Sequence, residues 1–551
     1  MRLFICSLLL SLSFQITLSQ TNMNTKYDVK WRAVDAAFKK GLTKTAETEI
    51  QSILKMAKAE KNTEQIIKAL CNYRVSLSSR DEKSRLHDIE LFTNELKNAN
   101  FPLKQILHSM LGDLYWTYYQ ENRYLILNRT QINAESEDAA KPLAGAQPDI
   151  ETWTATDFYN TAYTHFNASL TESERSKAYP LNKLAEILTP EKNTAHLRPT
   201  LYDFLLNRAI QYFAQHENEI TKPAYAFEIN DEKAFGDVSN FMKTNFRTSD
   251  TISQKYQVLK LYQQLLSFHL HDADPDALID ADIARILFVN QQSILTNKKE
   301  LYVAALKNIS SHYPNNQQAA MASYYIAESY SSVQNNPQAV AKNTLPEAKA
   351  ICLRIIENYP ESEAAYKADL LIQQIETHSL SIHTEKVILP NAPSLAKIDY
   401  RNIQQVFCKI VKLNSREYKE HSYSYQNDFK ELLTRNAIKT WSSALPDVKD
   451  FQPHSTEIKI DALPIGCYAL VISENAQFDA SGYTDIALLA VSELAYLYTD
   501  DQIKPGTTVF VMNRATGEPL AAANAKSWTQ TYNYNKQKNE LKEGPHYTTD
   551  K

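Results

Sequence analysis

Residues 359–382, YPESEAAYKADLLIQQIETHSLSI, contain the point at which this chain changes character. In the first part of the stretch, Ala365, Ala368 and Ile372 recur at the spacing of an amphipathic helix. Beyond His378 the apolar period becomes two, as in residues 406–411, VFCKIV, which alternate between the two faces of a strand. The sequence therefore predicts a helical array that is followed by antiparallel β-sandwich domains.

Length and composition indicate several globular domains. The chain has 551 residues, and single hydrophobic cores stop growing at about 250–300 residues. Hydrophobic residues make up 43% of the chain, which is typical of folded cores. The net charge of −5 provides no basic footprint for nucleic acid. Glycine is scarce, with 9 residues, as expected of a helical array in which each interior glycine costs about 1 kcal/mol.

The N-terminus has the pattern of a cleavable signal peptide at residues 1–20. Arg2 supplies a positive charge, residues 3–18 form a short apolar run, and we expect cleavage near Ser19 or Gln20. A buried first helix is the alternative. Cys6 lies inside the apolar run, too early to be lipidated at a cleavage site, and no other stretch could span a bilayer. We predict an exported protein that is periplasmic or extracellular, or associated with the cell envelope.

Two Tyr-Pro segments form an internal repeat. Residues 313–316, YPNN, and 359–362, YPES, are followed by alanines at the same offsets. Tyr-Pro ends one helix, and the polar residues after it cap the next. Between the two segments, Thr344 and Glu347 predict a capping box, with Pro346 in the first turn of a helix. The pattern resembles tetratricopeptide-type repeats and predicts stacked helix pairs.

Turn signals set the expected domain limits. We expect the helical array to cover residues 21–380, with a turn-rich interruption at residues 133–150. A first β-sandwich is expected at residues 381–480 and a second at residues 481–551. The second shows no closing strand, so we expect it to be incomplete.

Four cysteines follow the signal peptide, at Cys71, Cys352, Cys408 and Cys467. They show no C-x-x-C spacing, which argues against zinc and thioredoxin-type sites. Cys408 and Cys467 fall in two candidate strands of one β region. A disulfide between them and buried free thiols are both open.

The densest cluster of metal-ligating side chains lies at residues 269–282, with His269, His271, Asp272, Asp274, Asp276, Asp280 and Asp282. An EF-hand loop that starts at Asp272 would need glycine and glutamate where the chain has Ala277 and Ile283. A helix end, a loop and an Asp-capped helix start explain the same residues. We therefore expect no metal here.

The sequence contains no convincing catalytic motif. His216-Glu217 begins like a zincin helix, but Ile220 occupies the place of the second histidine. The aromatic run at residues 115–124 could bind a sugar or a peptide, although aromatic residues on an amphipathic helix more often pack in the core. We predict that the chain is not an enzyme, and we assign no catalytic, cofactor-binding or metal-binding residue.

Several segments form a recognisable series along the chain. The helical part contributes residues 114–116 (LYW), 122–124 (NRY), 128–130 (NRT) and 198–209 (RPTLYDFLLNRA). The β part contributes residues 398–402 (IDYRN), 463–468 (LPIGCY), 505–511 (PGTTVFV) and 516–520 (TGEPL). Together they resemble the N-terminal part of the bacterial alpha-2-macroglobulin family, in its large Bacteroidota-type branch.

The resemblance implies an exported endopeptidase inhibitor that traps proteases, with macroglobulin-like β-sandwiches that include an MG2-type domain. In many members, protease cleavage of a bait region releases a Cys–Gln thioester. This chain has no C-x-E-Q stretch, so bait and thioester regions would lie beyond residue 551. The helical lead-in is absent from the better-known macroglobulins, and it could dock a protein of the envelope. An envelope interaction scaffold is therefore the alternative function.

Overall fold

The computed structural model describes residues 26–78, 84–134, 150–188, 194–215, 225–250, 253–332, 344–423, 430–479, 482–500, 507–533 and 538–550. The signal-peptide prediction at residues 1–20 and most of the interruption predicted at 133–150 lie outside these ranges. The chain divides into two compact units, Met1–Ala319 and Ala320–Lys551, and each is described by itself.

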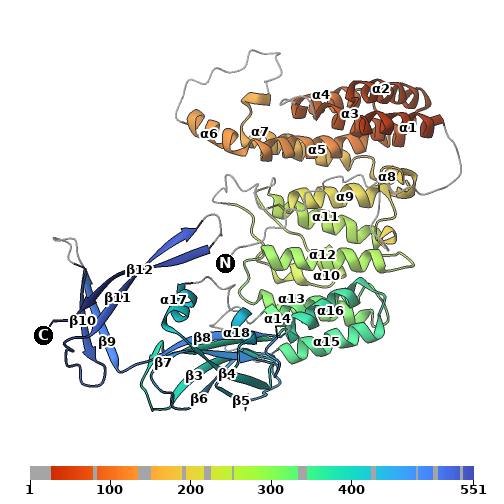
Figure 1. The fold of residues 1–551 in the computed structure, drawn as a ribbon. Coiled ribbons are helices and arrows are strands. Elements are labelled where there is room, and N and C mark those ends of the chain that lie inside the picture. Colours follow the sequence, from red (N-terminus) through yellow and green to blue (C-terminus); the bar gives the residue numbers. More distant parts are fainter. Residues whose placement is uncertain are drawn as a thin grey trace. The chain divides into compact units, whose positions relative to one another are not determined.

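The first unit is helical (Figure 1). Its α-helices are α1 (Lys26–Lys39), α2 (Thr43–Glu60), α3 (Thr63–Ser78), α4 (Ser84–Leu96), α5 (Leu103–Glu121), α6 (Arg123–Ala134), α7 (Ala155–Ser169), α8 (Ser173–Lys177), α9 (Leu201–Phe213), α10 (Val238–Lys243), α11 (Gln254–His269), α12 (Asp276–Gln292) and α13 (Lys298–His312). Short 3-10 turns are η1 (Ile150–Thr152), η2 (Leu181–Leu184), η3 (Ala195–Leu197) and η5 (Glu232–Phe235).

These helices form where apolar residues recur every three or four positions. On α2, Ile50, Ile53 and Ala57 make one fully buried stripe. Neighbouring helices pack on such stripes, so most of the helical stability comes from tertiary contacts rather than from intrinsic propensity.

Helices α5 and α7 approach each other closely at Gly112. A Cβ atom at Gly112 on α5 would lie 2.7 Å from the ring of Phe166 on α7. Only glycine leaves room for that ring, so Gly112 sets the separation of the two helices. Around this point Tyr115, Trp116 and Tyr119 are buried, and they extend the contact with large aromatic surfaces.

The second unit begins with three helices, α14 (Ala320–Ser332), α15 (Leu345–Asn358) and α16 (Glu363–Glu376). The predicted caps of the Tyr-Pro repeat are present. Asn316 Oδ1 accepts from the Ala319 amide at 2.9 Å before α14, and Ser362 Oγ accepts from the Ala365 amide at 3.0 Å in α16. The helical series ends at Glu376, as the change of sequence character near residue 380 predicts.

The predicted capping box of α15 is wrong. Pro346 does lie in the first turn, but the Thr344 side chain makes no capping hydrogen bond. Its hydroxyl instead donates to the Tyr330 carbonyl of α14 at 2.6 Å. A carbonyl near the end of a helix has no partner within the helix, and it therefore competes for the threonine hydroxyl.

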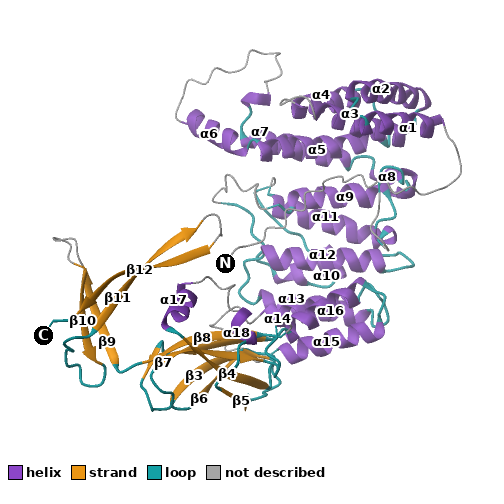
Figure 2. Cartoon of the chain, viewed as in Figure 1, coloured by secondary structure: helices purple, strands orange, loops and turns teal. Residues whose placement is uncertain are grey.

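The β-sandwich is made of two sheets (Figure 2). A five-stranded sheet has the order β2-β8-β7-β4-β5, and a three-stranded sheet has the order β1-β3-β6. All pairs are antiparallel except β2 with β8. The strands are β1 (Ser379–Thr384), β2 (Val387–Ile388), β3 (Ser394–Arg401), β4 (Gln405–Leu413), β5 (Lys439–Ala444), β6 (His454–Ile460), β7 (Gly466–Ser473) and β8 (Thr484–Val491).

The central strands β4 and β7 are buried on both faces. One face contributes alternate residues to the core between the sheets: Val406, Cys408, Ile410, Tyr468, Leu470 and Ile472. The other face joins Leu432 of α18 (Lys430–Thr434) in a second cluster, near α17 (Ser415–Tyr423). Burial on both faces explains why these strands read as almost continuous apolar runs.

Two domain limits differ from the prediction. Strand β8 completes the first sandwich, so the predicted limit at residue 480 falls inside that sandwich. The described residues beyond Val491 form two separate two-stranded sheets instead of a second sandwich. These sheets pair β9 (Leu494–Asp500) with β10 (Thr507–Asn513) and β11 (Asn524–Asn533) with β12 (Lys538–Thr548).

The predicted fold class, helices followed by antiparallel β domains, is confirmed. No helix in the described part of the chain is long and apolar enough to cross a membrane.

The α5–α7 contact gives a stability prediction. Gly112→Ala should destabilise the protein by about 1–3 kcal/mol, because the new methyl group overlaps the Phe166 ring. Urea unfolding followed by circular dichroism measures this loss. Combining Gly112→Ala with Phe166→Leu should cost less than the sum of the two single changes, since the smaller side chain makes room. Strict additivity would show that the two sites do not press on each other.

Candidate functional site

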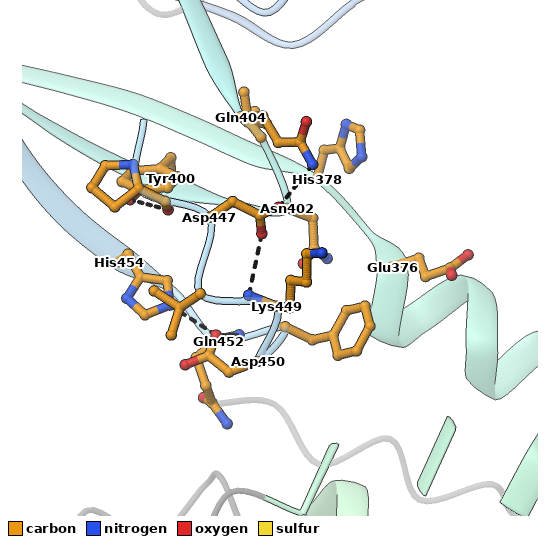
Figure 3. A pocket seen from close by; sticks show the side chains of 14 residues that line it. Glu376, His378, Tyr400, Asn402, Gln404, Asp447, Lys449, Asp450, Gln452 and His454 are labelled. Atoms are coloured by element: carbon orange, nitrogen blue, oxygen red, sulfur yellow. Dashed lines mark hydrogen bonds and ion pairs between the residues drawn. The ribbon is translucent and has the colours of Figure 1, made fainter. Parts of the chain in front are cut away.

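The described part of the second unit contains a polar pocket of about 370 Å³. It lies between the end of α16, the turn after β3 and the loop from β5 to β6 (Figure 3). Its charged side chains come from Glu376, His378, Asp447, Lys449, Asp450 and His454. Tyr400, Asn402, Ile403, Gln404, Pro446, Val448, Phe451 and Gln452 complete the lining.

Two aspartates shape the loop that forms one wall. Asp450 Oδ1 accepts from the Gln452 amide at 2.9 Å and from His454 Nε2 at 2.8 Å. Asp447 accepts from the Lys449 amide at 3.2 Å and from Gln404 Nε2 at 2.9 Å (Figure 3). These bonds hold a loop that bends sharply.

The bend places non-glycine residues in the left-handed region. Lys449 has φ 54°, Phe451 has φ 60°, and Asn402 across the pocket has φ 57°. Each of the first two costs about 1–2 kcal/mol relative to the right-handed conformation, whereas asparagine tolerates it better. The surrounding hydrogen bonds therefore fix this wall against a local backbone preference.

The opposite wall is the capped end of α16. Arg401 donates to the Ile375 carbonyl at 3.0 Å, and Asn402 Nδ2 donates to the carbonyls of Ile375 and Thr377 at 2.9 and 3.1 Å. Arg401 Nε also donates to the Phe451 carbonyl at 2.8 Å. The last carbonyls of a helix have no partner inside the helix, so these side chains satisfy them and join the helix to the sandwich.

Neighbouring groups shift the pKa of two residues in the pocket, Asp450 and Tyr400. Burial alone would raise the pKa of Asp450, but hydrogen bonds from the Gln452 amide and His454 outweigh it and lower the pKa. Burial, together with the charges of Asp450 and Asp447, raises the pKa of Tyr400. Tyr400 thus stays a neutral phenol, and its hydroxyl donates to the Pro446 carbonyl at 2.8 Å.

The pocket can hold a small polar group, but the carboxylates of Asp447 and Asp450 already accept hydrogen bonds from the protein. Its lining includes no serine, threonine or cysteine that could act as a nucleophile. Both loop carboxylates accept hydrogen bonds from backbone amides of the loop itself. The hydrogen bonds around the pocket join α16, the end of β3 and the loop between β5 and β6.

The acidic and histidine cluster at residues 269–282 is divided among separate structural roles. Asp274 accepts from the Asp276 amide at 3.0 Å, Asp276 and Asp280 bond to Asn316 and Gln318, and buried Asp282 pairs with Arg285 at 2.7 Å. Within the described residues, no group of three or more His, Cys, Asp or Glu side chains is placed to hold a metal ion.

His269 has the most constrained position in that cluster. It is buried at the end of α11, where Nε2 lies 2.8 Å from Asp203 Oδ1 and Nδ1 lies 2.7 Å from Asp272 Oδ2. The other oxygen of Asp203 accepts from the Thr200 amide at 2.9 Å in the capping box of α9. Burial disfavours the imidazolium, but the two carboxylates outweigh it and raise the pKa of His269.

The other candidates from the sequence have clear outcomes. In the aromatic run, Tyr115, Trp116 and Tyr119 are core residues, whereas Tyr124 is exposed. Cys408 and Cys467 are free thiols, so the disulfide alternative is wrong. They lie on opposite faces of the sheet, and burial raises the pKa of Cys408 to about 12. The partial zincin motif at His216 lies outside the described residues.

Sequence patterns did not reveal the pocket. Its walls come from three places in the chain, and its polar residues lie in turns where such residues are common. The run of Pro446, Asp447 and Asp450 is a turn signal that could have drawn attention to the loop. The partners at α16 are distant in sequence and could not be inferred from local spacing.

Comparison with known proteins gives weak structural likenesses, of which one is described here. No known family and no curated protein matches the sequence. Among solved structures, the chain is similar to native alpha-2-macroglobulin from Escherichia coli, in a structure spanning domains MG0-NIE-MG1. The sequences are 11% identical, the TM-score is 0.23, and the match covers 31% of this chain and 55% of that one. The chain thus spans about half of that structure, and a likeness at this level carries no argument about function.

The helix cap predicts the effect of two substitutions at one position. Asn402→Gly keeps the positive φ but removes both side-chain hydrogen bonds, and it should cost about 1 kcal/mol. Asn402→Ala should cost about 1 kcal/mol more, because alanine resists the left-handed conformation. Urea unfolding of both variants measures the difference. Equal stabilities would show that the backbone relaxes at this turn.

His269 predicts a pH dependence with a definite sign. Its folded pKa lies above the unfolded value of about 6.5, so its contribution is complete below that pH and is lost as pH rises through the folded pKa. His269→Gln should therefore lose less stability than the wild type as the pH rises above about 6.5. Exposed His271 offers the control variant His271→Gln, which should follow the wild type. Urea unfolding at several pH values measures the free energy of unfolding of each protein. Parallel curves of this free energy against pH for all three proteins would contradict the prediction.

Proposed function

We propose that this chain is a non-catalytic, protein-binding segment of an exported macroglobulin-like endopeptidase inhibitor. Two kinds of observation support the proposal. The series of segments from residue 114 to residue 520 resembles that family, and the helices followed by β domains match the order that the resemblance implies. Proteases are the proposed partners, and export by the N-terminal segment is part of the proposal.

The observation that carries protein binding is the hairpin of β9 and β10. Tyr498 pairs with Val509, and Leu497 pairs with Phe510. Because successive residues of a strand point to opposite faces, these two pairs lie on opposite sides of the hairpin. All four side chains are between 45% and 64% exposed.

A hairpin that is apolar on both faces differs from a strand at an ordinary sheet surface, where one face is polar. Contiguous exposed apolar side chains mark protein interaction sites on soluble proteins. Two strands alone are also marginally stable in water. The hairpin therefore gains stability when another protein surface covers it, which suits a segment that rearranges around or docks onto a partner.

The helices α14–α16 favour a second candidate function, an envelope interaction scaffold. Tyr366 and Leu370 stand one turn apart on α16, and they are 67% and 47% exposed. Stacked helix pairs of the tetratricopeptide kind bind proteins on exposed faces of this type. In this alternative, the β domains act as spacers and the partner is not a protease.

Binding to inactive proteases tests the leading proposal. Endopeptidases of the serine, cysteine and metallo classes, each inactivated by replacing a catalytic residue, serve as probes against the full chain in biolayer interferometry. We expect at least one to bind, and the double variant Leu497→Ser with Phe510→Ser to reduce its affinity by about tenfold or more, as loss of buried aromatic anchors does. Tyr225→Ser, which removes another exposed tyrosine, should leave the affinity unchanged.

The remaining outcomes distinguish the candidates. Binding that survives the hairpin changes but is lost in Tyr366→Ser with Leu370→Ser would favour the scaffold. Failure of every protease to bind, together with hydrolysis of a peptide or glycan by the purified chain, would contradict both non-catalytic proposals.

A further inference from the structure

Two histidines from different helices of the first unit face each other at hydrogen-bond distance. His108 on α5 and His165 on α7 have their Nδ1 atoms 3.1 Å apart. The rings are 5.2 Å apart between centroids and inclined by 48°. Both side chains are half-buried. This pair is unrelated to the β9–β10 hairpin, and the inference goes beyond the proposed function.

The packing of α5 on α7 enforces the encounter. Gly112 lies one turn beyond His108, and it receives the ring of Phe166, the residue next to His165. The Tyr115 ring packs against His165 at 5.5 Å between centroids. These contacts hold the two helices together next to the pair, and the two imidazoles are placed before any ligand arrives. Such preorganisation is what a binding site needs.

One of the two Nδ1 atoms carries the proton of the hydrogen bond between them, and a metal ion would replace it once that proton moves to Nε2 of the same ring. Burial, with a smaller contribution from the charge of His108, lowers the pKa of His165 to about 4. Burial, followed by the charge of Lys104, lowers the pKa of His108. At neutral pH both rings are therefore neutral, and neutral imidazole is the form that binds metals.

The separation of the two nitrogens also fits one metal ion. Zinc–imidazole bonds are about 2.0–2.1 Å long. Two nitrogens 3.1 Å apart that bind one metal ion therefore form a nitrogen–metal–nitrogen angle of about 100°. That angle lies between those of square-planar and tetrahedral coordination. The nitrogens would need to separate little, although each ring must turn its lone pair toward the shared ion.

We propose that His108 and His165 form a two-histidine site for a divalent transition-metal ion, Zn²⁺ or Cu²⁺, that cross-links α5 to α7. The described residues place no third His, Cys, Asp or Glu side chain to complete such a group, so water fills the other positions. Lys104 is the charged side chain that faces His108, and its repulsion keeps the affinity moderate. By the usual order for nitrogen ligands, Cu²⁺ binds more tightly than Zn²⁺, and Mg²⁺ does not bind.

Thermal unfolding with added metal tests the site. The full chain is melted with and without ZnCl₂, CuCl₂ or MgCl₂, followed by circular dichroism. We expect Zn²⁺ and Cu²⁺ to raise Tm by about 3 °C, because the folded state holds the two nitrogens together and binds these ions more tightly than the unfolded chain does, and Mg²⁺ to leave it unchanged. His108→Gln and His165→Gln should each abolish the rise. His312→Gln, which removes an exposed histidine of the same unit, should retain it.

A second measurement does not depend on the variants. Electron paramagnetic resonance of the wild-type Cu²⁺ complex should report two coordinated imidazole nitrogens. A wild-type Tm that does not respond to Zn²⁺ or Cu²⁺ would overturn the proposal, as would a rise that persists in both ligand variants. A count of no nitrogens, or of three or more, would also overturn it.

Discussion

The second unit depends on how the last carbonyls of α16 are satisfied. The last carbonyl groups of a helix have no hydrogen-bond partner inside the helix. Burying them against a sheet without other donors would destabilise the folded state. Arg401 and Asn402, at the end of β3, supply the donors, and Arg401 reaches onward to the Phe451 carbonyl in the loop between β5 and β6. One pair of side chains thus joins a helix, a strand and a loop. The adjacent helices α14 and α15 then belong to the β unit instead of to the helices before them.

The same constraint explains why many polar side chains of the pocket already have hydrogen-bond partners in the protein. The pocket walls are the segments that contact one another, and the polar side chains form the hydrogen bonds between and within these segments. The aspartates hold the loop, the amide caps the helix, and Tyr400 donates to the Pro446 carbonyl. Buried polar networks that are fully satisfied give rigidity and a unique structure. In this region the second unit has a rigid joint between α16 and the sandwich.

Polar groups in the first unit are used in the same way. His269 is held between two carboxylates, and one of these also belongs to the capping box of α9. The buried guanidinium of Arg285 pairs with Asp282 and donates to the Gly236 carbonyl at 2.9 Å. The His108–His165 pair differs, because its hydrogen bond joins two imidazole rings instead of a charged pair.

The sequence by itself determined the order of the architecture. Apolar spacing of three and four residues before residue 376, and of two residues after it, reflects which faces the backbone must bury, and this is a local property. The Tyr-Pro caps could be predicted for the same reason, since the capping side chain lies three residues from the amide it serves. The contacts between distant segments could not be predicted in this way. The Thr344 hydroxyl donates to a carbonyl on another helix, and β8 belongs to the sandwich although it lies beyond the expected limit. His108 met His165 across 57 residues of chain, and Arg401 met α16 across 26. Only tertiary packing brings such groups together, because residues far apart in the chain leave no periodic trace of their contact.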